Sequence, residues 1–243
     1  MDGYGPATYG DIWADLYDDL YPGPGADQVE FLVRRAGGGP VLELAIGSGR
    51  VALPVMAAGV PIHGVEISGA MINRLRAKPG GADIPIVASD MTDFTVEESY
   101  PLAILGANTL FAPLEEHLQR GIFRSVAAAL APDGAFVVEC FVPDLGRFDR
   151  GQTVRVNEVT LDRVVVEYTI HDAANQTNRT MVEIRWRDGR SAVYPVVVRY
   201  MWPEEIDAMA ASSDLHLAER FEWYDESPFT QDSPRHVSVY GRD

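Results

Sequence analysis

The sequence predicts an α/β fold: a seven-stranded, mostly parallel sheet with an antiparallel terminal hairpin and an inserted antiparallel β-meander. Three observations lead to this prediction. Short apolar runs alternate with helical patterns between residues 41 and 141, which is typical of a parallel sheet with helices on both faces. Residues 153–200 change to β-rich runs without helices. The last two runs are joined by a short loop with no crossover helix, which favours an antiparallel pair.

The N-terminal residues 1–36 are expected to form helices that act as a lid. Apolar and aromatic side chains recur at helical spacing over residues 11–20, and the prolines and glycines of residues 22–25 end this helix. A second helix includes residues 29–33 and stops at the glycine-rich stretch 37–40. Because an isolated helix of about ten residues is marginal in water, we expect the lid to order mainly when a ligand is bound.

Residues 37–150 are expected to form the core of the fold. The predicted strands are residues 41–44, 62–65, 84–88, 102–105 and 135–141. The predicted helices are residues 50–58, 68–77 and 114–130. Parallel sheets of this kind bind ligands at the carboxyl ends of their strands, and we expect the functional site there.

Residues 151–201 are expected to form the meander, which would cover the substrate site. Its β-rich runs are residues 154–156, 164–170, 181–186 and 193–200, and turns are expected at residues 157–158, 174–175 and 188–189. Residues 202–243 would complete the main sheet. They contain a helix that opens at Pro203, a favoured first-turn residue, and strands at residues 217–223 and 236–240.

The composition excludes several classes of partner. The formal net charge is −16, and no cluster of basic residues stands out, which argues against nucleic acids and anionic membranes. No apolar run approaches the roughly 18 residues that cross a bilayer, and the N-terminus lacks a signal-peptide pattern. We therefore expect a cytoplasmic protein with a small-molecule substrate, and a homodimer is an assembly that the sequence allows.

The sequence indicates no metal site. The single cysteine, Cys140, lies in an apolar run and is expected to be a buried core thiol. One cysteine forms neither an internal disulfide nor a cysteine-rich zinc site. No histidines and carboxylates show metal-ligand spacing such as H-x-x-x-H, so we expect no bound metal.

A glycine-containing loop follows the first predicted strand. Residues 43–49, Glu-Leu-Ala-Ile-Gly-Ser-Gly, lead from that strand into a helix, and glycines let the backbone turn sharply and approach a ligand. Glu66 comes 19 residues after Gly47 and ends the next strand. An acidic side chain in that place suits a ribose diol, which donates two hydrogen bonds. The pattern indicates a site for an adenosine-containing cofactor.

The same loop leaves an NAD-dependent oxidoreductase open, because residues 47–52 fit the dinucleotide pattern G-x-G-x-x-A. Three features oppose this alternative. Glu43 would be unwelcome near a pyrophosphate but can orient loop amides or a cationic amino-acid group. Asp90 and Met91 close the third strand, where an acidic and an apolar group can bind adenine. The final strands look like a hairpin rather than a second βαβαβ half.

On these residues the sequence resembles the class I S-adenosylmethionine (SAM)-dependent methyltransferases, which have a Rossmann-like fold. The resemblance covers residues 9–141 and the closing hairpin, with Ala45 in place of the family's first loop glycine. It implies SAM as the cofactor and S-adenosylhomocysteine as the product. The residues expected around the methionine part and the methyl group are Glu43, Ala45, Gly47, Gly49, Asn108 and Thr109.

The resemblance also implies contacts with the nucleoside part of SAM. Glu66 would hold the ribose hydroxyls. Ile67 and Met71 would pack on the adenine ring, whose amine Asp90 would receive, with the Met91 backbone at the ring edge.

Two further likenesses favour N-methylation. Residues 14–21 resemble the N-terminal helix of glycine and aminosugar N-methyltransferases, in which a tyrosine lies beside the sulfonium, and Tyr17 is the best match. The meander looks like the substrate-covering sheet of sugar N-methyltransferases that tailor antibiotics. The resemblance therefore implies methyl transfer to an amine of an aminosugar or natural-product intermediate, a reaction that depends mainly on positioning.

Candidates for other roles remain. His117, after the fourth-strand loop, is a candidate general base, although a solvated first helical turn is an equally good interpretation. His171 is expected at the surface. The histidines expected in structural positions are His63, His216 and His236. The aromatic candidates for a substrate wall are Phe111, Trp202, Trp223 and Phe229. Two further alternatives are an O-methyltransferase, which would need a base more strongly, and a SAM-binding module without catalysis.

Overall fold

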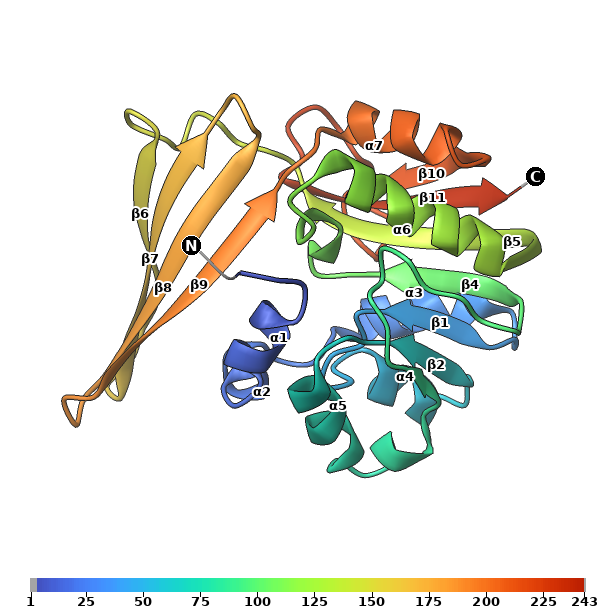
Figure 1. Cartoon of the computed structure of the whole chain (residues 1–243), viewed down its shortest axis with the longest axis horizontal. Helices are drawn as coiled ribbons and strands as arrows, with labels where there is room; N and C mark the ends of the chain where they lie inside the picture. Colours follow the sequence, from blue (N-terminus) through green and yellow to red (C-terminus); the bar gives the residue numbers. More distant parts are fainter. Residues whose placement is uncertain (1–3, 243) are drawn as a thin grey trace.

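The computed structural model describes residues 4–242 and shows a main sheet with a separate meander (Figure 1). The main sheet has seven strands in the order β10-β11-β5-β4-β1-β2-β3. They are β1 (Val41–Leu44), β2 (Ile62–Val65), β3 (Ile86–Val87), β4 (Tyr100–Leu105), β5 (Leu130–Phe141), β10 (Leu215–Phe221) and β11 (Arg235–Arg242). Pairs from β3 to β5 are parallel, and β11 pairs antiparallel with β5 and β10. The predicted sheet and its terminal hairpin are confirmed.

Helices cover both faces of the main sheet. They are α3 (Ala26–Ala36), α4 (Ala52–Ala57), α5 (Gly69–Arg76), α6 (Glu116–Ala129) and α7 (Pro203–Ala211), with the 3-10 helices η1 (Gly81–Asp83) and η2 (Thr109–Phe111). In β4, Ala103 and Leu105 belong to the apolar cluster beneath α6 and α7, whereas Leu102 and Ile104 belong to the cluster beneath α3 and α4. This alternation is the signature of a sheet buried on both faces. Burial of each large apolar side chain contributes roughly 1.5–3 kcal/mol.

The helix α3, which the sequence analysis grouped with the lid, packs on the main sheet. Its residues Phe31, Leu32 and Ala36 are buried in the same cluster as α4, and Gly37 ends it with φ 58° as a left-handed cap. Only the helices before α3 therefore lie away from the main sheet. Among residues 4–242, no helix is both long and apolar enough to span a bilayer.

The meander is a four-stranded antiparallel sheet. Its strands are β6 (Gln152–Val159), β7 (Arg163–Asp172), β8 (Thr177–Trp186) and β9 (Ser191–Arg199). The turns expected at residues 174–175 and 188–189 are confirmed. The inserted meander is confirmed as well.

The turn expected at residues 157–158 is wrong. Strand β6 continues to Val159, with a β-bulge between Val156 and Glu158. The chain turns after Thr160 instead, because its hydroxyl oxygen accepts the backbone N–H groups of Asp162 and Arg163. Such local side-chain bonds stabilise turns.

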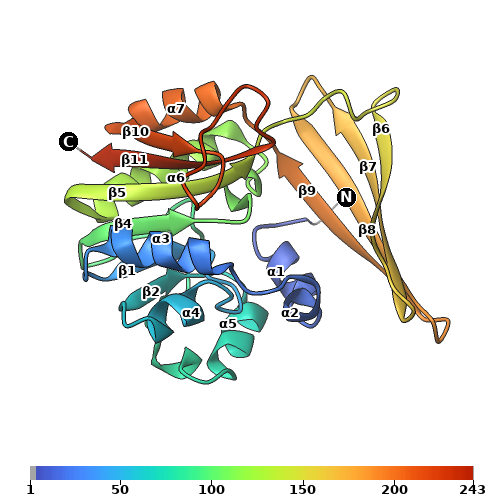
Figure 2. The same cartoon turned by 180° about the vertical axis from the view of Figure 1, so that it is seen from behind.

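The single helix expected over residues 11–20 is wrong in its continuity. The chain forms α1 (Thr8–Trp13) and α2 (Tyr17–Leu20), and a hydrogen bond from Leu16 N to Trp13 O (2.9 Å) tightens the turn between them. The break lets Trp13, which is 0% exposed, pack against Tyr194 of the meander with ring centroids 4.9 Å apart. Both views place α1 and α2 between the meander and the main sheet (Figures 1 and 2).

Candidate functional site

The glycine loop, residues 45–49, joins β1 to α4 through left-handed backbone conformations. The angle φ is 50° at Ala45, 58° at Gly47 and 79° at Gly49. A Cβ at Gly49 would lie 2.3 Å from Leu75 Cδ1, whereas a Cβ at Gly47 would meet only Ala45 O, at 3.8 Å. Glycine is therefore required for packing at Gly49, and the space above Gly47 is open to a ligand. Ala45 holds its conformation at a cost of about 1–2 kcal/mol.

Glu66 connects the end of β2 to this loop. Its Oε2 accepts the backbone N–H of Gly47 (2.9 Å), and its Oε1 accepts that of Ser68 (2.8 Å). Burial raises the pKa of Glu66, and these backbone amides oppose the rise. Each carboxylate oxygen keeps a lone pair, so the side chain is held in place and still able to accept ribose hydroxyls.

The residues expected around adenine gather beside Glu66, with one exception. A hydrogen bond from Ser89 N to Glu66 O (3.2 Å) places the turn after β3 next to the end of β2. In that turn, Asp90 Oδ1 accepts the N–H of Thr92 (2.9 Å). Ile67 is 40% exposed, so its apolar surface is accessible to the adenine ring of a ligand. Met71 differs, because it is buried against the cluster that contains Trp13.

A charged cluster lies beside the loop and is formed by the buried Glu43 and the partly buried Arg50 and Glu139. Burial is the main cause that raises the pKa of Glu43 to about 8, while Arg50 opposes the rise. Within residues 4–242, Glu43 Oε2 has no hydrogen-bond partner. A buried carboxylate oxygen without a hydrogen bond lowers the stability of the folded protein. A cationic group of a ligand would supply the missing hydrogen bond.

Arg50 and Glu139 were missed by sequence reasoning. Arg50 directly follows the glycine loop, so its place could have indicated it. Glu139 could not be recognised, because it lies inside an apolar strand and approaches Arg50 only through the order of strands in the sheet.

Glu139 also shapes the loop after β4. Its Oε2 accepts the N–H of Ala107 (3.2 Å) and the hydroxyl of Tyr224 (3.1 Å). Asn108 has φ 62° and its Oδ1 accepts the N–H of Phe141 (2.6 Å). The side-chain oxygen of the expected site residue Asn108 therefore holds the end of β5. The neighbouring Thr109 begins η2.

Helices α1 and α2 are fastened to the cofactor side by two carboxylates. Asp11 Oδ1 accepts the hydroxyl of Ser68 (2.6 Å). Asp18 Oδ1 accepts the hydroxyl of Ser48 (2.6 Å) and the ammonium of Lys78 (2.8 Å). Burial alone would raise the pKa of Asp18, but Lys78 and Ser48 lower it overall.

A tyrosine cluster, Tyr9, Tyr17 and Tyr21, lies between the charged cluster and the meander. The rings of Tyr17 and Tyr21 are 4.9 Å apart, and those of Tyr9 and Tyr17 are 6.5 Å apart. Burial raises the pKa of Tyr17, and the neighbouring Arg50 opposes the rise. Tyr17 thus lies directly beside the charged cluster, and its expected place next to the methyl donor stays a prediction.

The structure does not bring His117 to this place. Its side chain is 71% exposed, and its Nδ1 lies 3.3 Å from Glu115 Oε2 in the first turn of α6. His171, expected at the surface, instead has Nε2 3.0 Å from the hydroxyl of Tyr200 and stacks on Phe148.

The aromatic candidates for a substrate wall contact residues other than those of the tyrosine cluster. Phe111 is 0% exposed and packs on Phe141 in the core, which corrects its expected role as a wall. Trp202 precedes α7 and contacts Tyr200. Phe229 contacts His236.

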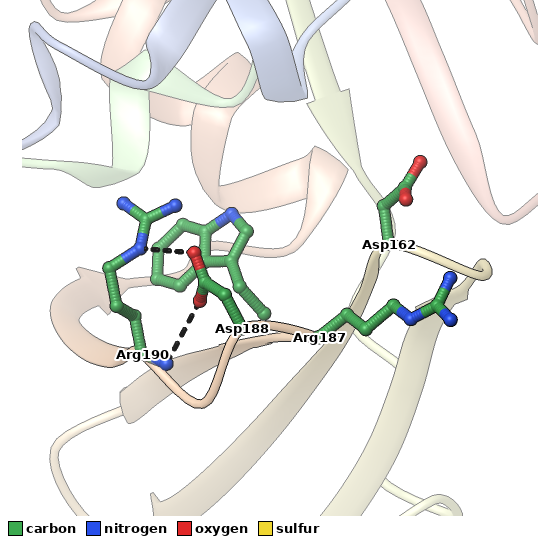
Figure 3. Close-up of a pocket in the computed structure, with 5 residues that line it drawn as sticks. Asp162, Arg187, Asp188 and Arg190 are labelled. Carbon is green, nitrogen blue, oxygen red and sulfur yellow. Dashed lines mark hydrogen bonds and ion pairs between the residues drawn. The ribbon is translucent and has the colours of Figure 1, made fainter.

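A hollow at the hairpin ends of the meander is separate from this site. It is lined by Asp162, Trp186, Arg187, Asp188 and Arg190. Figure 3 shows Asp188 bonded to Arg190. These residues lie in or next to the two turns at one end of the meander, so none of the expected cofactor residues lines the hollow. Within residues 4–242, no group of three or more histidine, cysteine or carboxylate side chains could hold a metal.

Comparisons with known proteins agree with this geometry. A family model described as a methyltransferase domain matches residues 41–134. The CcbJ methyltransferase from Streptomyces caelestis is 34% identical, with 99% of this chain and 100% of that chain covered and a TM-score of 0.91. The cypemycin N-terminal methyltransferase of Streptomyces sp is 25% identical over 98% of each chain.

A third similarity shows the fold alone. CalS10, an amino pentose methyltransferase from Micromonospora echinaspora solved with SAM bound, is 21% identical, covers 94% of this chain and 97% of its own, and has a TM-score of 0.73. Together the comparisons decide against the NAD-dependent oxidoreductase that the glycine loop alone left open.

Proposed function

The chain belongs to the class I SAM-dependent methyltransferases, and on that premise we propose that it methylates an amine nitrogen of an aminosugar or another natural-product intermediate. SAM supplies a methyl group on a positively charged sulfur, an electrophile that needs no further activation. The acceptor nitrogen forms the new N–C bond with its lone pair while the S–C bond breaks, and the resulting ammonium passes a proton to water. The enzyme then has to align the acceptor and exclude water.

The charged cluster fits the methionine part of SAM. That part carries an ammonium and a carboxylate. The unsatisfied Oε2 of Glu43 would accept a hydrogen bond from the ammonium, and Arg50 would bind the carboxylate. Glu66, already fixed by two backbone amides, would hold the ribose hydroxyls.

The tyrosine cluster supports a positioning mechanism. Tyr17 lies between Arg50 and Tyr21, so its ring would form one wall beside the methyl group and its hydroxyl could orient the acceptor. Tyr9 and Tyr21 extend this wall toward the meander. Rigid aromatic side chains of this kind fix geometry and displace water.

One observation carries the choice of nitrogen over oxygen: among residues 4–242, the contacts that the histidines make are with residues other than Tyr9, Tyr17 and Tyr21. His63, His171 and His236 bond to Tyr100, Tyr200 and Ser238. His117 is bonded to Glu115 at the surface, and His216 lies on the edge strand β10 opposite Gly241. A hydroxyl acceptor needs a base more than a neutral amine does, so this arrangement favours an amine.

The relatives support the same choice. Two of them, an N-terminal methyltransferase and an amino pentose methyltransferase, are named for acceptors that carry an amine. The proposal extends this class of acceptor to the present chain.

A matched pair of acceptors tests the proposal. The rate of S-adenosylhomocysteine formation would be measured with the methyl glycoside of an amino pentose and with the glycoside that has a hydroxyl in place of the amine. We expect the amine to react at least about 10²-fold faster, since general-base catalysis, which the hydroxyl requires, contributes at least that factor. Equal rates, or a faster reaction of the hydroxyl, would make the enzyme an O-methyltransferase.

A further inference from the structure

Glu167 lies on the face of the meander that packs toward α1 and α2. Its cross-strand partner on β8 is Val182, which is buried in the same apolar cluster as Trp13. Val165, two residues earlier on β7, belongs to that cluster too. Because alternate side chains of a strand share one face, Glu167 lies on the same face as Val165, next to the apolar contact between the meander and helices α1 and α2.

The Glu167 carboxylate lies next to the tyrosine cluster. It interacts electrostatically with Tyr21, whose ring is 4.9 Å from that of Tyr17. Tyr17 in turn lies against Arg50 beside the glycine loop. Tyr9 and Tyr17 also pack against the apolar cluster that contains Val165 and Val182, so the face of the meander that carries Glu167 adjoins the tyrosine cluster.

Unlike the other glutamates of the meander, Glu167 has no cation of its own. Glu158 is bonded to Arg163, and Glu183 is bonded to Arg185. In the part of the chain that the structure describes, no hydrogen bond or ion pair engages Glu167. Arg155 on the edge strand β6 lies directly opposite Glu167 in register, but it is exposed and forms no ion pair with Glu167 in the described part of the chain.

Glu167 is partly exposed on the inner face of the meander, and within residues 4–242 no ion pair neutralises it, so its charge is available to a ligand. Amines are mostly protonated at neutral pH. A carboxylate on the acceptor side of the tyrosines is therefore placed to attract a cationic acceptor.

We propose that Glu167 binds the protonated amine of the incoming acceptor by a charge-assisted hydrogen bond and so selects cationic over neutral acceptors. This inference rests on the proposed function and names a residue for it. Glu167 acts as a specificity residue: it brings the ammonium form of the acceptor to the tyrosine cluster and takes no part in bond making. The ammonium then passes one proton to water, and the freed nitrogen lone pair forms the N–C bond while the S–C bond of SAM breaks. Its loss should therefore change KM more than kcat.

The test compares two glutamates of the same sheet. Glu167→Gln keeps the size of the side chain and removes its charge. Glu183→Gln is the matched control, because Glu183 is on the neighbouring strand, paired in register with Val166 rather than with a residue of the inner face. The acceptors are the methyl glycosides of an amino pentose and an amino hexose and a short peptide with a free N-terminal amine, and the fastest with the wild type is used.

For Glu167→Gln we expect KM to rise at least about tenfold, the loss typical of a hydrogen bond to a charged group, with kcat within about threefold. S-adenosylhomocysteine affinity by titration calorimetry should stay unchanged, which also shows that the variant folds. The wild-type KM should rise with ionic strength, because salt screens the attraction, and this salt dependence should disappear in Glu167→Gln. The control should keep the wild-type values.

The possible outcomes separate the two proposals. A wild-type KM in Glu167→Gln, or an equal rise in Glu183→Gln, overturns this inference and leaves N-methylation standing. Methylation of oxygen on these acceptors, with KM still raised in Glu167→Gln, overturns the proposed function and leaves Glu167 as the residue that binds the amine. Turnover of none of the three acceptors overturns the inference, since it commits to this class of compound.

Discussion

The Asp18 carboxylate of α2 accepts a hydrogen bond from the Ser48 hydroxyl of the glycine loop at 2.6 Å. The ammonium of Lys78 reaches the same Asp18 oxygen and also the backbone oxygen of Ser48, both at 2.8 Å. Helix α2 and the glycine loop are thus joined through one carboxylate. We expect α1 and α2 to act as a lid whose closure depends on the shape of this loop.

Asp18→Asn should loosen the lid, because the neutral amide loses the charge that holds Lys78. We expect amide exchange over residues 8–21 to become at least about tenfold faster in the S-adenosylhomocysteine complex, measured by hydrogen-exchange mass spectrometry. Asp15→Asn is the control, since the Asp15 side chain is 98% exposed. In the wild type, this segment should be more protected with the ligand than without it. Equal protection in both states would rule out a lid.

The contacts of Asp18 with Ser48 and Lys78 should also respond to pH. Because the pKa of Asp18 is lowered below its ordinary value of 3.8, these contacts contribute fully to folding stability above that value. Their contribution is lost only as pH falls through the lower pKa of Asp18 in the folded state.

Glu66→Ala should weaken cofactor binding at least about tenfold, because two charge-assisted hydrogen bonds to the ribose are lost. The same carboxylate accepts the amides of Gly47 and Ser68, so a lower Tm is expected as well. Titration calorimetry with S-adenosylhomocysteine and thermal unfolding measure the two effects. Normal affinity in this variant would mean that the ribose lies elsewhere.

Glu43 makes the ligand-free protein sensitive to mild alkali. Burial raises its pKa from 4.5 to about 8, so between these values the folded state binds a proton that the unfolded state has released. Stability should therefore fall as pH rises through this range. Urea unfolding at pH 6 and pH 9 should show a larger loss for the wild type than for Glu43→Gln. The same loss in both would remove Glu43 as the cause.

Sequence patterns were sufficient for the main sheet and for the position of Glu66 beside the glycine loop. Strands such as residues 41–44 and 62–65 are short apolar runs bounded by glycine and proline, and the structure reproduces both ranges. Glu66 could be recognised because its distance from the glycine loop is set by one βα unit. These features depend on local chemistry, which a single sequence displays.

The charged cluster and the arrangement of α1 and α2 depend on tertiary contacts and could not be predicted. Glu139 meets Arg50 only because β5, β4 and β1 are neighbours in the sheet. The predicted N-terminal helix is interrupted between Trp13 and Tyr17, because Trp13 packs on Tyr194, a residue about 180 positions away in the sequence. His117 looked favourable in sequence, yet its helix turns it toward solvent.

Tyr17 and His117 separate positioning from acid–base catalysis. Tyr17→Ala should slow single-turnover methyl transfer by about 10²-fold, since it removes a wall that aligns the acceptor. Tyr17→Phe should fall between this variant and the wild type, because it keeps the ring and loses the contact of the hydroxyl with Arg50. His117→Ala should stay within about twofold, far below the effect of losing a general base. A larger loss in His117→Ala that recovers at high pH would indicate a base-driven reaction on oxygen.

The most direct test of the central claim is the identity of the atom that receives the methyl group. The purified enzyme would be given SAM with a carbon-13 methyl group together with an acceptor that carries both an amine and hydroxyls, such as the amino pentose glycoside. Carbon–proton NMR of the product then distinguishes an N-methyl from an O-methyl group. We expect the label on nitrogen alone. Label on oxygen would contradict the account.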